Sequence, residues 1–301
     1  MKTGIAIACL ATALTTAVAP ARAQTQTRDG MPMEVPVPTP VKTGHVAANG
    51  IDYYYAVYGK GEPLLLLHGG LGQIEMFGPN LGTLAAERQV IGVDLQGHGR
   101  TRLGNRPIDL VDIGDDLAVI VQALGYKQVD VMGYSFGGGA AFRLAVQHPS
   151  LVRRLVLVST PFSQDGFYPE MLPQQAQVSA AMAPMMKDTP MYKSYMAIAP
   201  DPGEFPKLLD AMGAFMRRPY DWSGDVKRLT MPVMLVYGDA DMIRLDHVAE
   251  FYHLLGGGQR DAGWNREHMS RNRLAILPNV THYEIGVSPQ LAPTVLSFLG
   301  K

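Results

Sequence analysis

A serine flanked by glycines, between an apolar strand and a helical stretch, is the feature that most constrains this sequence. Gly133-Tyr134-Ser135-Phe136-Gly137 follows the strand-like run 129–132, and two further glycines open the next stretch. A sharp turn at Ser135 brings the flanking glycines against neighbouring backbone and exposes the hydroxyl at a helix N-terminus. There, the helix dipole and free amides stabilise negative charge that develops beside the serine. The motif therefore predicts a strand–turn–helix unit with Ser135 as a candidate nucleophile.

A serine nucleophile also requires a base and an orienting carboxylate, because its hydroxyl is too weakly acidic to attack alone. Two apolar runs are followed by such groups. Asp239 and Asp241 follow the run 233–237, and His282 follows the run 273–277. If these runs are strands of one sheet, their carboxyl ends lie at the edge where open α/β folds place their sites. Both aspartates remain candidates on this reasoning.

The remainder of the core alternates short β-type runs with longer amphipathic stretches. Predicted strands cover 51–58, 63–67, 89–94, 128–133, 155–159, 233–237 and 273–277. Predicted helices cover 110–124, 137–147, 247–255 and 289–299. The continuous apolar runs 64–67 and 155–158 are typical of strands buried on both faces. This pattern predicts an α/β fold with a mostly parallel sheet flanked by helices.

Two intervals interrupt this alternation. Residues 161–231 have no strong strand signal and many prolines, and they are too long for an ordinary connection, so we expect a helical insertion. Methionines at 171, 182, 185, 186, 191, 196, 212, 216 and 231 either form a surface that adapts to apolar ligands or fill a core. The second interval, 256–272, opens with glycines and contains Trp264, and it is predicted to be a surface loop.

The first residues have the order of an export signal. Residues 1–23 contain one early positive charge, an apolar run over 5–19 and small residues up to Ala23. The run is shorter than the roughly 20 residues that span a membrane, so we expect a cleaved signal peptide and no stable membrane anchor. The only cysteine, Cys9, is lost with it. We therefore expect a periplasmic or secreted protein whose residues 24–43 form a flexible arm.

Four ordered motifs give this chain a resemblance to a known family. They are His68-Gly69-Gly70-Leu71-Gly72, the segment 94–101 (Asp-Leu-Gln-Gly-His-Gly-Arg-Thr), the turn at Ser135 and Gly238-Asp239-Ala240-Asp241. Over about residues 44–299 the chain resembles α/β-hydrolases of the capped esterase, lactonase and haloperoxidase-like group. The resemblance implies a core of residues 44–160 and 232–301. It also implies a helical cap, residues 161–231, inserted between the sixth and seventh strands.

The resemblance also implies site roles. The family's acid matches the fourth position of Gly-Asp-Ala-Asp, which selects Asp241 in place of Asp239. Ser135 is then the nucleophile and His282 the base. The oxyanion hole is implied to consist of the backbone amides of Phe136 and Gly70. Neither a cofactor nor a metal is implied.

The implied activity is hydrolysis of a carboxylic ester or lactone of a small, apolar substrate through an acyl-enzyme on Ser135. Perhydrolysis of the haloperoxidase-like kind shares the same three residues and remains an alternative. Aminopeptidase action is a second alternative, although Leu71 stands where proline iminopeptidases have proline and no cap carboxylate can be assigned to an amine. A non-catalytic ligand-binding protein is a third. Epoxide hydrolase and dehalogenase chemistry, which use a carboxylate nucleophile, are disfavoured.

Charge and histidine spacing limit the other classes of partner. The chain has 26 basic and 27 acidic residues and a formal net charge of -1, which gives no global field for nucleic acid or anionic membranes. His247 and His253 are six residues apart, so they do not share one helical face as two metal ligands would. His68 and His98 are expected to make structural hydrogen bonds. The expected partner is a small ester or lactone, and the oligomeric state stays open.

Overall fold

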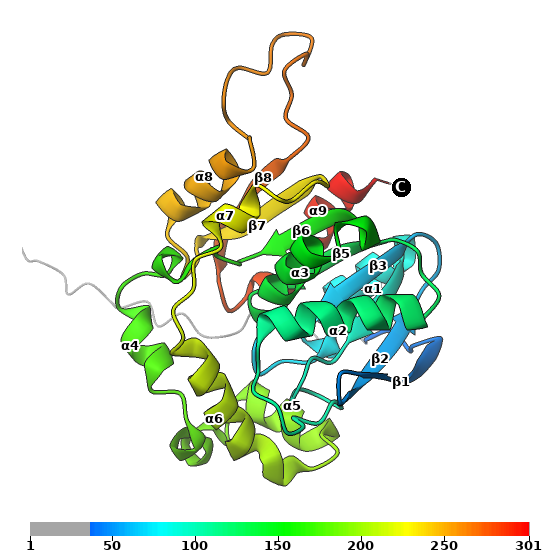
Figure 1. Cartoon of the computed structure of the whole chain (residues 1–301), viewed down its shortest axis with the longest axis vertical. Helices are drawn as coiled ribbons and strands as arrows, with labels where there is room; N and C mark the ends of the chain where they lie inside the picture. The colour runs from blue at the N-terminus through cyan, green and yellow to red at the C-terminus, as the bar shows by residue number, and fades with distance from the viewer. Residues whose placement is uncertain (1–36, 301) are drawn as a thin grey trace, which may run out of the picture. The chain divides into compact units, whose positions relative to one another are not determined.

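An eight-stranded sheet organises residues 37–300, the part of the chain that this computed structural model describes (Figure 1). The strands are β1 (Lys42–Ala48), β2 (Ile51–Tyr58), β3 (Pro63–Leu67), β4 (Gln89–Val93), β5 (Val129–Tyr134), β6 (Val152–Val158), β7 (Val233–Ala240) and β8 (Arg273–Thr281). Their order is β1-β2-β4-β3-β5-β6-β7-β8, and only β2 runs against its neighbours. The predicted fold class is confirmed. The predicted signal peptide and most of the arm lie outside the described residues.

Strand β1 begins inside the stretch that the sequence predicted to be a flexible arm. Lys42 and Thr43 pair with Val57 and Ala56 of β2. The connecting hairpin turns at Asn49-Gly50, where φ is 47° and 84°, the positive values that a tight two-residue hairpin requires. Lys42 and Thr43, the last two residues of the predicted arm, are therefore part of β1.

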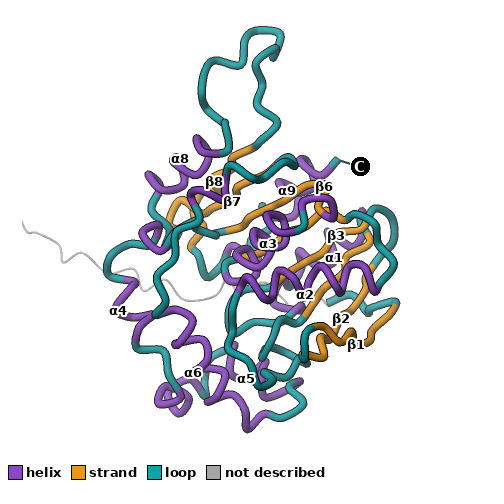
Figure 2. Tube along the Cα trace, in the orientation of Figure 1, coloured by secondary structure: helices purple, strands orange, loops and turns teal. Residues whose placement is uncertain are grey.

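Helices cover both faces of the sheet (Figure 2). They are α1 (Pro79–Glu87), α2 (Leu110–Ala123), α3 (Phe136–Gln147), α8 (Leu245–Leu254) and α9 (Leu291–Leu299). Leu65 and Leu67 belong to the apolar cluster shared with α2, α3 and α8, whereas Leu64 and Leu66 belong to the cluster shared with α1 and α9. The strands are thus buried on both faces, as their continuous apolar runs predicted. Among the described helices, none is long and apolar enough to cross a membrane.

A helical insertion separates β6 from β7. It contains α4 (Met171–Ala176), α5 (Pro190–Ile198), α6 (Phe205–Met216) and α7 (Ser223–Val226), together with short 3-10 turns. Side chains of α6 lie against the loops after β3 and β4, because Met212 approaches Gly70 and Leu208 approaches Gly97. The insertion therefore packs over the carboxyl ends of the strands, the edge where the site was predicted.

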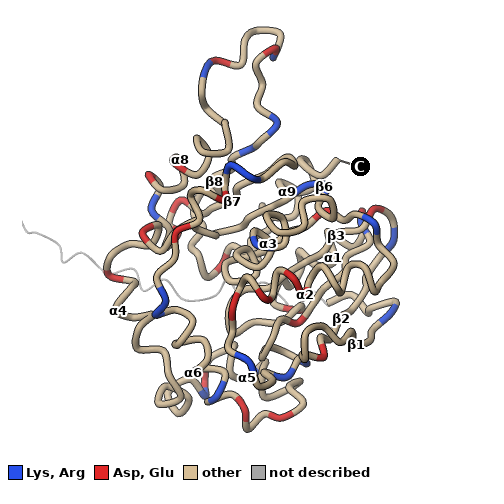
Figure 3. Tube along the Cα trace, in the orientation of Figure 1, with Lys and Arg blue, Asp and Glu red and all other residues tan. Residues whose placement is uncertain are grey.

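The loop over residues 256–272 joins α8 to β8 and projects away from the sheet (Figure 1). It carries both basic and acidic positions (Figure 3). The indole of Trp264 is 98% exposed. A surface loop was predicted here, and the structure shows one.

A buried ionic cluster lies at the opposite end of β5 from Ser135. The Asp130 carboxylate is fully buried and accepts hydrogen bonds from Arg88 at 3.1 Å and from Arg153 at 2.7 and 2.9 Å. Arg88 also donates to the backbone oxygens of Leu299 and Gly300 at the end of α9. A buried charge of this kind depends on its partners, because the loss of one charge leaves the other buried and uncompensated in a medium of low dielectric.

This dependence predicts a large effect of removing the carboxylate. Asp130→Ala should lower the free energy of unfolding by about 3–5 kcal/mol, because it leaves Arg88 buried and unpaired. The matched control is Asp52→Ala. The Asp52 side chain is 70% exposed and lies 3.2 Å from His45 Nδ1, so its removal should cost under about 1 kcal/mol. Guanidinium unfolding measures both. Similar losses in the two variants would contradict the structural role of Asp130.

Candidate active site

Ser135 occupies a strained turn between β5 and α3. Its φ of 52° and ψ of -115° are unfavourable for a residue with a side chain. A Cβ atom on Gly133 would lie 2.2 Å from the backbone oxygen of Gly137, and one on Gly137 would lie 2.3 Å from that of His68. Only glycine fits at both positions. The predicted tight turn is therefore present, and close backbone packing keeps it in place.

The turn brings Ser135 to His282. The Oγ of Ser135 lies 3.1 Å from His282 Nε2, and His282 Nδ1 lies 2.8 Å from Asp241 Oδ1. The His282 and Asp241 side chains are almost fully buried, at 7% and 0% exposure. The structure thus joins the predicted serine, histidine and aspartate in one chain of hydrogen bonds. Such a chain can move a proton from the hydroxyl to the imidazole while the carboxylate holds the ring.

The two candidate aspartates lie in different surroundings. Asp239 is exposed, and hydrogen bonds from the backbone amides of Asn279 and Val280 hold its carboxyl pKa below the usual value. Asp241 instead points inward, towards His282. The pairing register between β7 and β8 shifts between Gly238 and Ala240, the interval that contains Asp239. Of the two aspartates, Asp241 is therefore the one that contacts His282.

Three supporting contacts were not found from the sequence. The hydroxyl of Ser159, at the end of β6, donates to Asp241 Oδ2, and Ile243 N donates to Asp241 Oδ1 at 3.2 Å. The Tyr134 hydroxyl donates to the backbone oxygen of His282 at 2.7 Å. A polar residue at the end of the apolar run 155–158 was the only signal for Ser159, and that signal does not reveal its partner.

Gly70 and Phe136 lie next to each other, as an oxyanion hole would require. A Cβ atom on Gly70 would lie 3.8 Å from the Cβ of Phe136 and 3.1 Å from the methyl of Met212. Within the described chain, neither backbone amide donates a hydrogen bond. Phe136 is the first residue of α3, where the amide has no partner inside the helix. The two amides are thus available to a negatively charged oxygen.

His68 and His98 make structural hydrogen bonds beneath this loop. The Nδ1 of His68 donates to Gly69 O at 2.7 Å, and its Nε2 accepts from Leu95 N at 2.9 Å. Burial lowers the pKa of His68 to about 4 and the pKa of His98 to about 3. Both rings are therefore neutral at pH 7. Within residues 37–300, no group of three or more His, Cys, Asp or Glu side chains could hold a metal ion.

These two pKa shifts predict acid sensitivity of the fold. In the unfolded chain both histidines bind protons below about pH 6.5, whereas in the folded protein they stay neutral down to about pH 4. The unfolded state then holds more protons, so stability falls as the pH falls through this window. Each histidine should contribute about 1–2 kcal/mol to the loss between pH 7 and pH 5.

Urea unfolding at the two pH values measures this loss. His98→Asn should make the pH-dependent difference smaller, while His268→Asn, at an exposed position in the loop 256–272, should leave it unchanged. An undiminished difference in His98→Asn would show that other groups cause the acid sensitivity.

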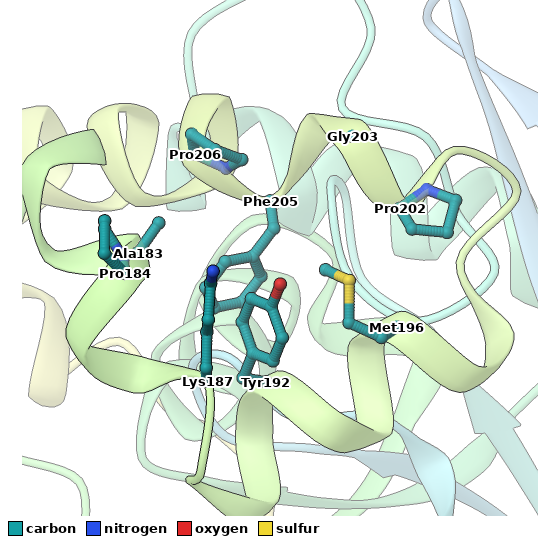
Figure 4. Close-up of a pocket in the computed structure, with 9 residues that line it drawn as sticks. All are labelled: Ala183, Pro184, Lys187, Tyr192, Met196, Pro202, Gly203, Phe205 and Pro206. Atoms are coloured by element: carbon teal, nitrogen blue, oxygen red, sulfur yellow. The ribbon is translucent and has the colours of Figure 1, made fainter.

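Two cavities lie near the insertion. One, of about 320 Å³, is next to the site, and its lining is Tyr168, Glu170, Met171, Ala240, Asp241, Met242, Thr281, His282 and Tyr283. The other, of about 340 Å³, lies among the helices of the insertion, where Tyr192, Met196 and Phe205 point into it (Figure 4). Ser135, Asp241 and His282 do not line this second cavity. Of the two cavities, only the first is lined by Asp241 and His282.

Comparison with known proteins supports the same fold. Residues 62–187 match the family described as alpha/beta hydrolase fold. A putative carbamate hydrolase from Azorhizobium caulinodans is 34% identical over 116 residues, which are 38% of this chain and 44% of that protein. A pimeloyl-[acyl-carrier protein] methyl ester esterase from Neisseria meningitidis is 29% identical over 219 residues, 66% of this chain and 82% of that protein. The chain thus spans less than half of the first relative's length.

Solved structures extend the likeness to most of the described chain. A carboxylesterase from Bacillus subtilis superposes with a TM-score of 0.68 and 18% identity, covering 87% of this chain and 93% of that one. A thermophilic esterase from Thermogutta terrifontis gives 0.67 with 19% identity, covering 86% and 98%. At these identities the likeness shows the fold alone, which is the α/β-hydrolase fold.

Proposed function

We propose that this protein of the α/β-hydrolase fold is a serine hydrolase that cleaves a carboxylic ester or lactone through an acyl-enzyme on Ser135. The proposal rests on the hydrogen-bonded chain from Ser135 through His282 to Asp241, with contacts of 3.1 and 2.8 Å. Relatives and neighbours named as esterases support the class of reaction. The substrate is a small molecule, and the apolar insertion over the site favours an apolar acyl or alcohol group.

In the proposed mechanism, Ser135 Oγ attacks the substrate carbonyl while His282 Nε2 takes the hydroxyl proton. Asp241 accepts a hydrogen bond from His282 Nδ1 and stabilises the charged ring. The tetrahedral oxyanion receives hydrogen bonds from the amides of Gly70 and Phe136. His282 then returns the proton to the leaving oxygen, and a water molecule later hydrolyses the acyl-enzyme in the same way.

The alternatives differ in what supports them. Leu71 has φ 57°, which proline cannot adopt, so this loop differs from the His-Gly-Gly-Pro-Gly loop of proline iminopeptidases. Perhydrolysis uses the same three residues and stays an alternative for the same site. A non-catalytic binding protein would not need the complete chain of hydrogen bonds. The tests below separate this last alternative from catalysis.

Export remains a proposal of its own. It rests on the order of charge, apolar run and small residues over 1–23, which lie outside the described part of the chain. Cleavage after Ala23 would leave a cysteine-free protein in an oxidising compartment.

The first test removes the nucleophile. Ser135→Ala should lower kcat on p-nitrophenyl butyrate by about 10³-fold or more, because the acyl-enzyme can no longer form. A fluorophosphonate should label the wild type and leave this variant unlabelled. Ser150→Ala, at an exposed position before β6, is the matched control and should keep both activity and labelling. Retained turnover in Ser135→Ala, or an unlabelled wild type, would overturn the proposal.

The second test compares the two aspartates. Asp241→Asn should lower kcat by about 10³- to 10⁴-fold, because an amide no longer orients His282 or stabilises its charge. Asp239→Asn should keep kcat within about twofold, since exposed surface substitutions rarely disturb a site. Steady-state kinetics with one chromogenic ester measures both. A larger loss in Asp239→Asn would reverse the assignment of the acid.

A further inference from the structure

The cavity beside His282 joins two parts of the chain. One part of its lining comes from the ends of β7 and β8 and the residues directly after them. The other part is Tyr168, Glu170 and Met171, at the start of α4. The amide of Tyr168 donates to the backbone oxygen of Met242 at 3.2 Å. Phe167 and Ile243 form an isolated antiparallel β-bridge. These backbone contacts hold the start of α4 against the loop after β7. The two parts of the lining of this cavity, which has a volume of about 320 Å³, are therefore held together by backbone contacts.

The direction of proton transfer assigns this cavity to one part of the substrate, on the basis of the proposed function. The acyl carbon bonds to Ser135 Oγ as its bond to the leaving oxygen breaks. The leaving oxygen takes its proton from His282 Nε2, so it must come within hydrogen-bond reach of that atom. The leaving group then extends among the side chains that surround His282. Of the two cavities near the insertion, only this one is lined by His282, although Ser135 does not line it, and the alcohol portion is assigned to it on that ground.

Charge restricts which alcohol this cavity favours. Two carboxylates, of Glu170 and Asp241, line it, and its lining contains no lysine or arginine. Asp241 is committed to His282, but Glu170 is exposed and makes no salt bridge with any residue in the described range. Glu170 precedes α4 without a capping hydrogen bond from its side chain. Its charge is thus open to a bound molecule, and an anionic leaving group would meet repulsion.

Aromatic rings add a second attraction for a cation. Tyr168 and Tyr283 line the same cavity and are 39% and 73% exposed. The Tyr283 ring stands edge-on to His282, with centroids 5.8 Å apart. An ammonium group near the face of a tyrosine is attracted by the ring's negative face, in addition to a nearby carboxylate. We propose that this cavity binds the leaving alcohol and selects alcohols that carry an ammonium group, with Glu170 as the specificity-determining residue.

A pair of esters that differ only in charge tests the proposal. Butyrylcholine and 3,3-dimethylbutyl butyrate share the acyl group and the shape of the alcohol, but only the first is cationic. In the wild type, kcat/KM should be about fivefold or more higher for butyrylcholine at low ionic strength, and the ratio should fall in 0.5 M NaCl. Glu170→Gln should reduce the ratio to about two or less, chiefly through KM for the cationic ester.

Glu250→Gln is the matched control, because this glutamate is exposed on α8 and does not line the cavity. It should keep the wild-type ratio. A wild-type ratio of one or less, or an unchanged ratio in Glu170→Gln, would overturn the inference. If the protein cleaves p-nitrophenyl butyrate but neither butyrylcholine nor 3,3-dimethylbutyl butyrate, this inference is overturned while the proposed function stands. Failure to cleave any of the three esters would instead overturn the proposed function.

Discussion

The close approach of backbone at Ser135 is the constraint on which the rest of the site depends. Gly133 and Gly137 touch neighbouring backbone so closely that a methyl group fits at neither position. This contact holds Ser135 at φ 52° and starts α3 directly behind it, leaving the Phe136 amide free. Because β5 lies between β3 and β6 in the sheet, Ser135 is flanked by the loop with Gly70, which follows β3, and by Ser159, which follows β6. Strain at one residue is therefore tolerated because the surrounding sheet determines its position.

The sequence revealed those parts of the fold whose signal is local. Continuous apolar runs located β3, and the glycine-flanked serine located the turn and the beginning of α3. Strand β1 was missed because it is an edge strand with little burial, although Asn49-Gly50 is a strong hairpin signal. The full length of β8 was missed because Pro278 and Asn279 suggest the end of a strand. In the structure, a register shift against β7 lets the pairing continue to Thr281. Such a shift depends on two strands far apart in sequence.

The site shows the same division. Ser135 and His282 could be predicted from motif and order, but spacing alone left Asp239 and Asp241 open. The two differ only in the folded chain, where Asp239 is exposed and Asp241 contacts His282. The proposed role of Glu170 had no local signal either, because the cavity that it lines forms only where the insertion meets the loop after β7. Residues that define a pocket come from separate segments, so a single sequence does not assemble them.

The ionic cluster around Asp130 and the candidate site at Ser135 lie at opposite ends of β5. Stability and substrate binding therefore depend on different ends of this strand. Asp130 and Ser135 belong to the same short segment, yet Asp130 faces the ends of α1 and α9 while Ser135 faces the insertion. Adaptation to a new substrate can thus proceed through the insertion without touching the ionic cluster that secures the last helix. Conversely, shortening the chain at its carboxyl end would remove the oxygens that Arg88 holds. An engineer who needs a smaller version of this protein should therefore keep Leu299 and Gly300 and shorten it elsewhere.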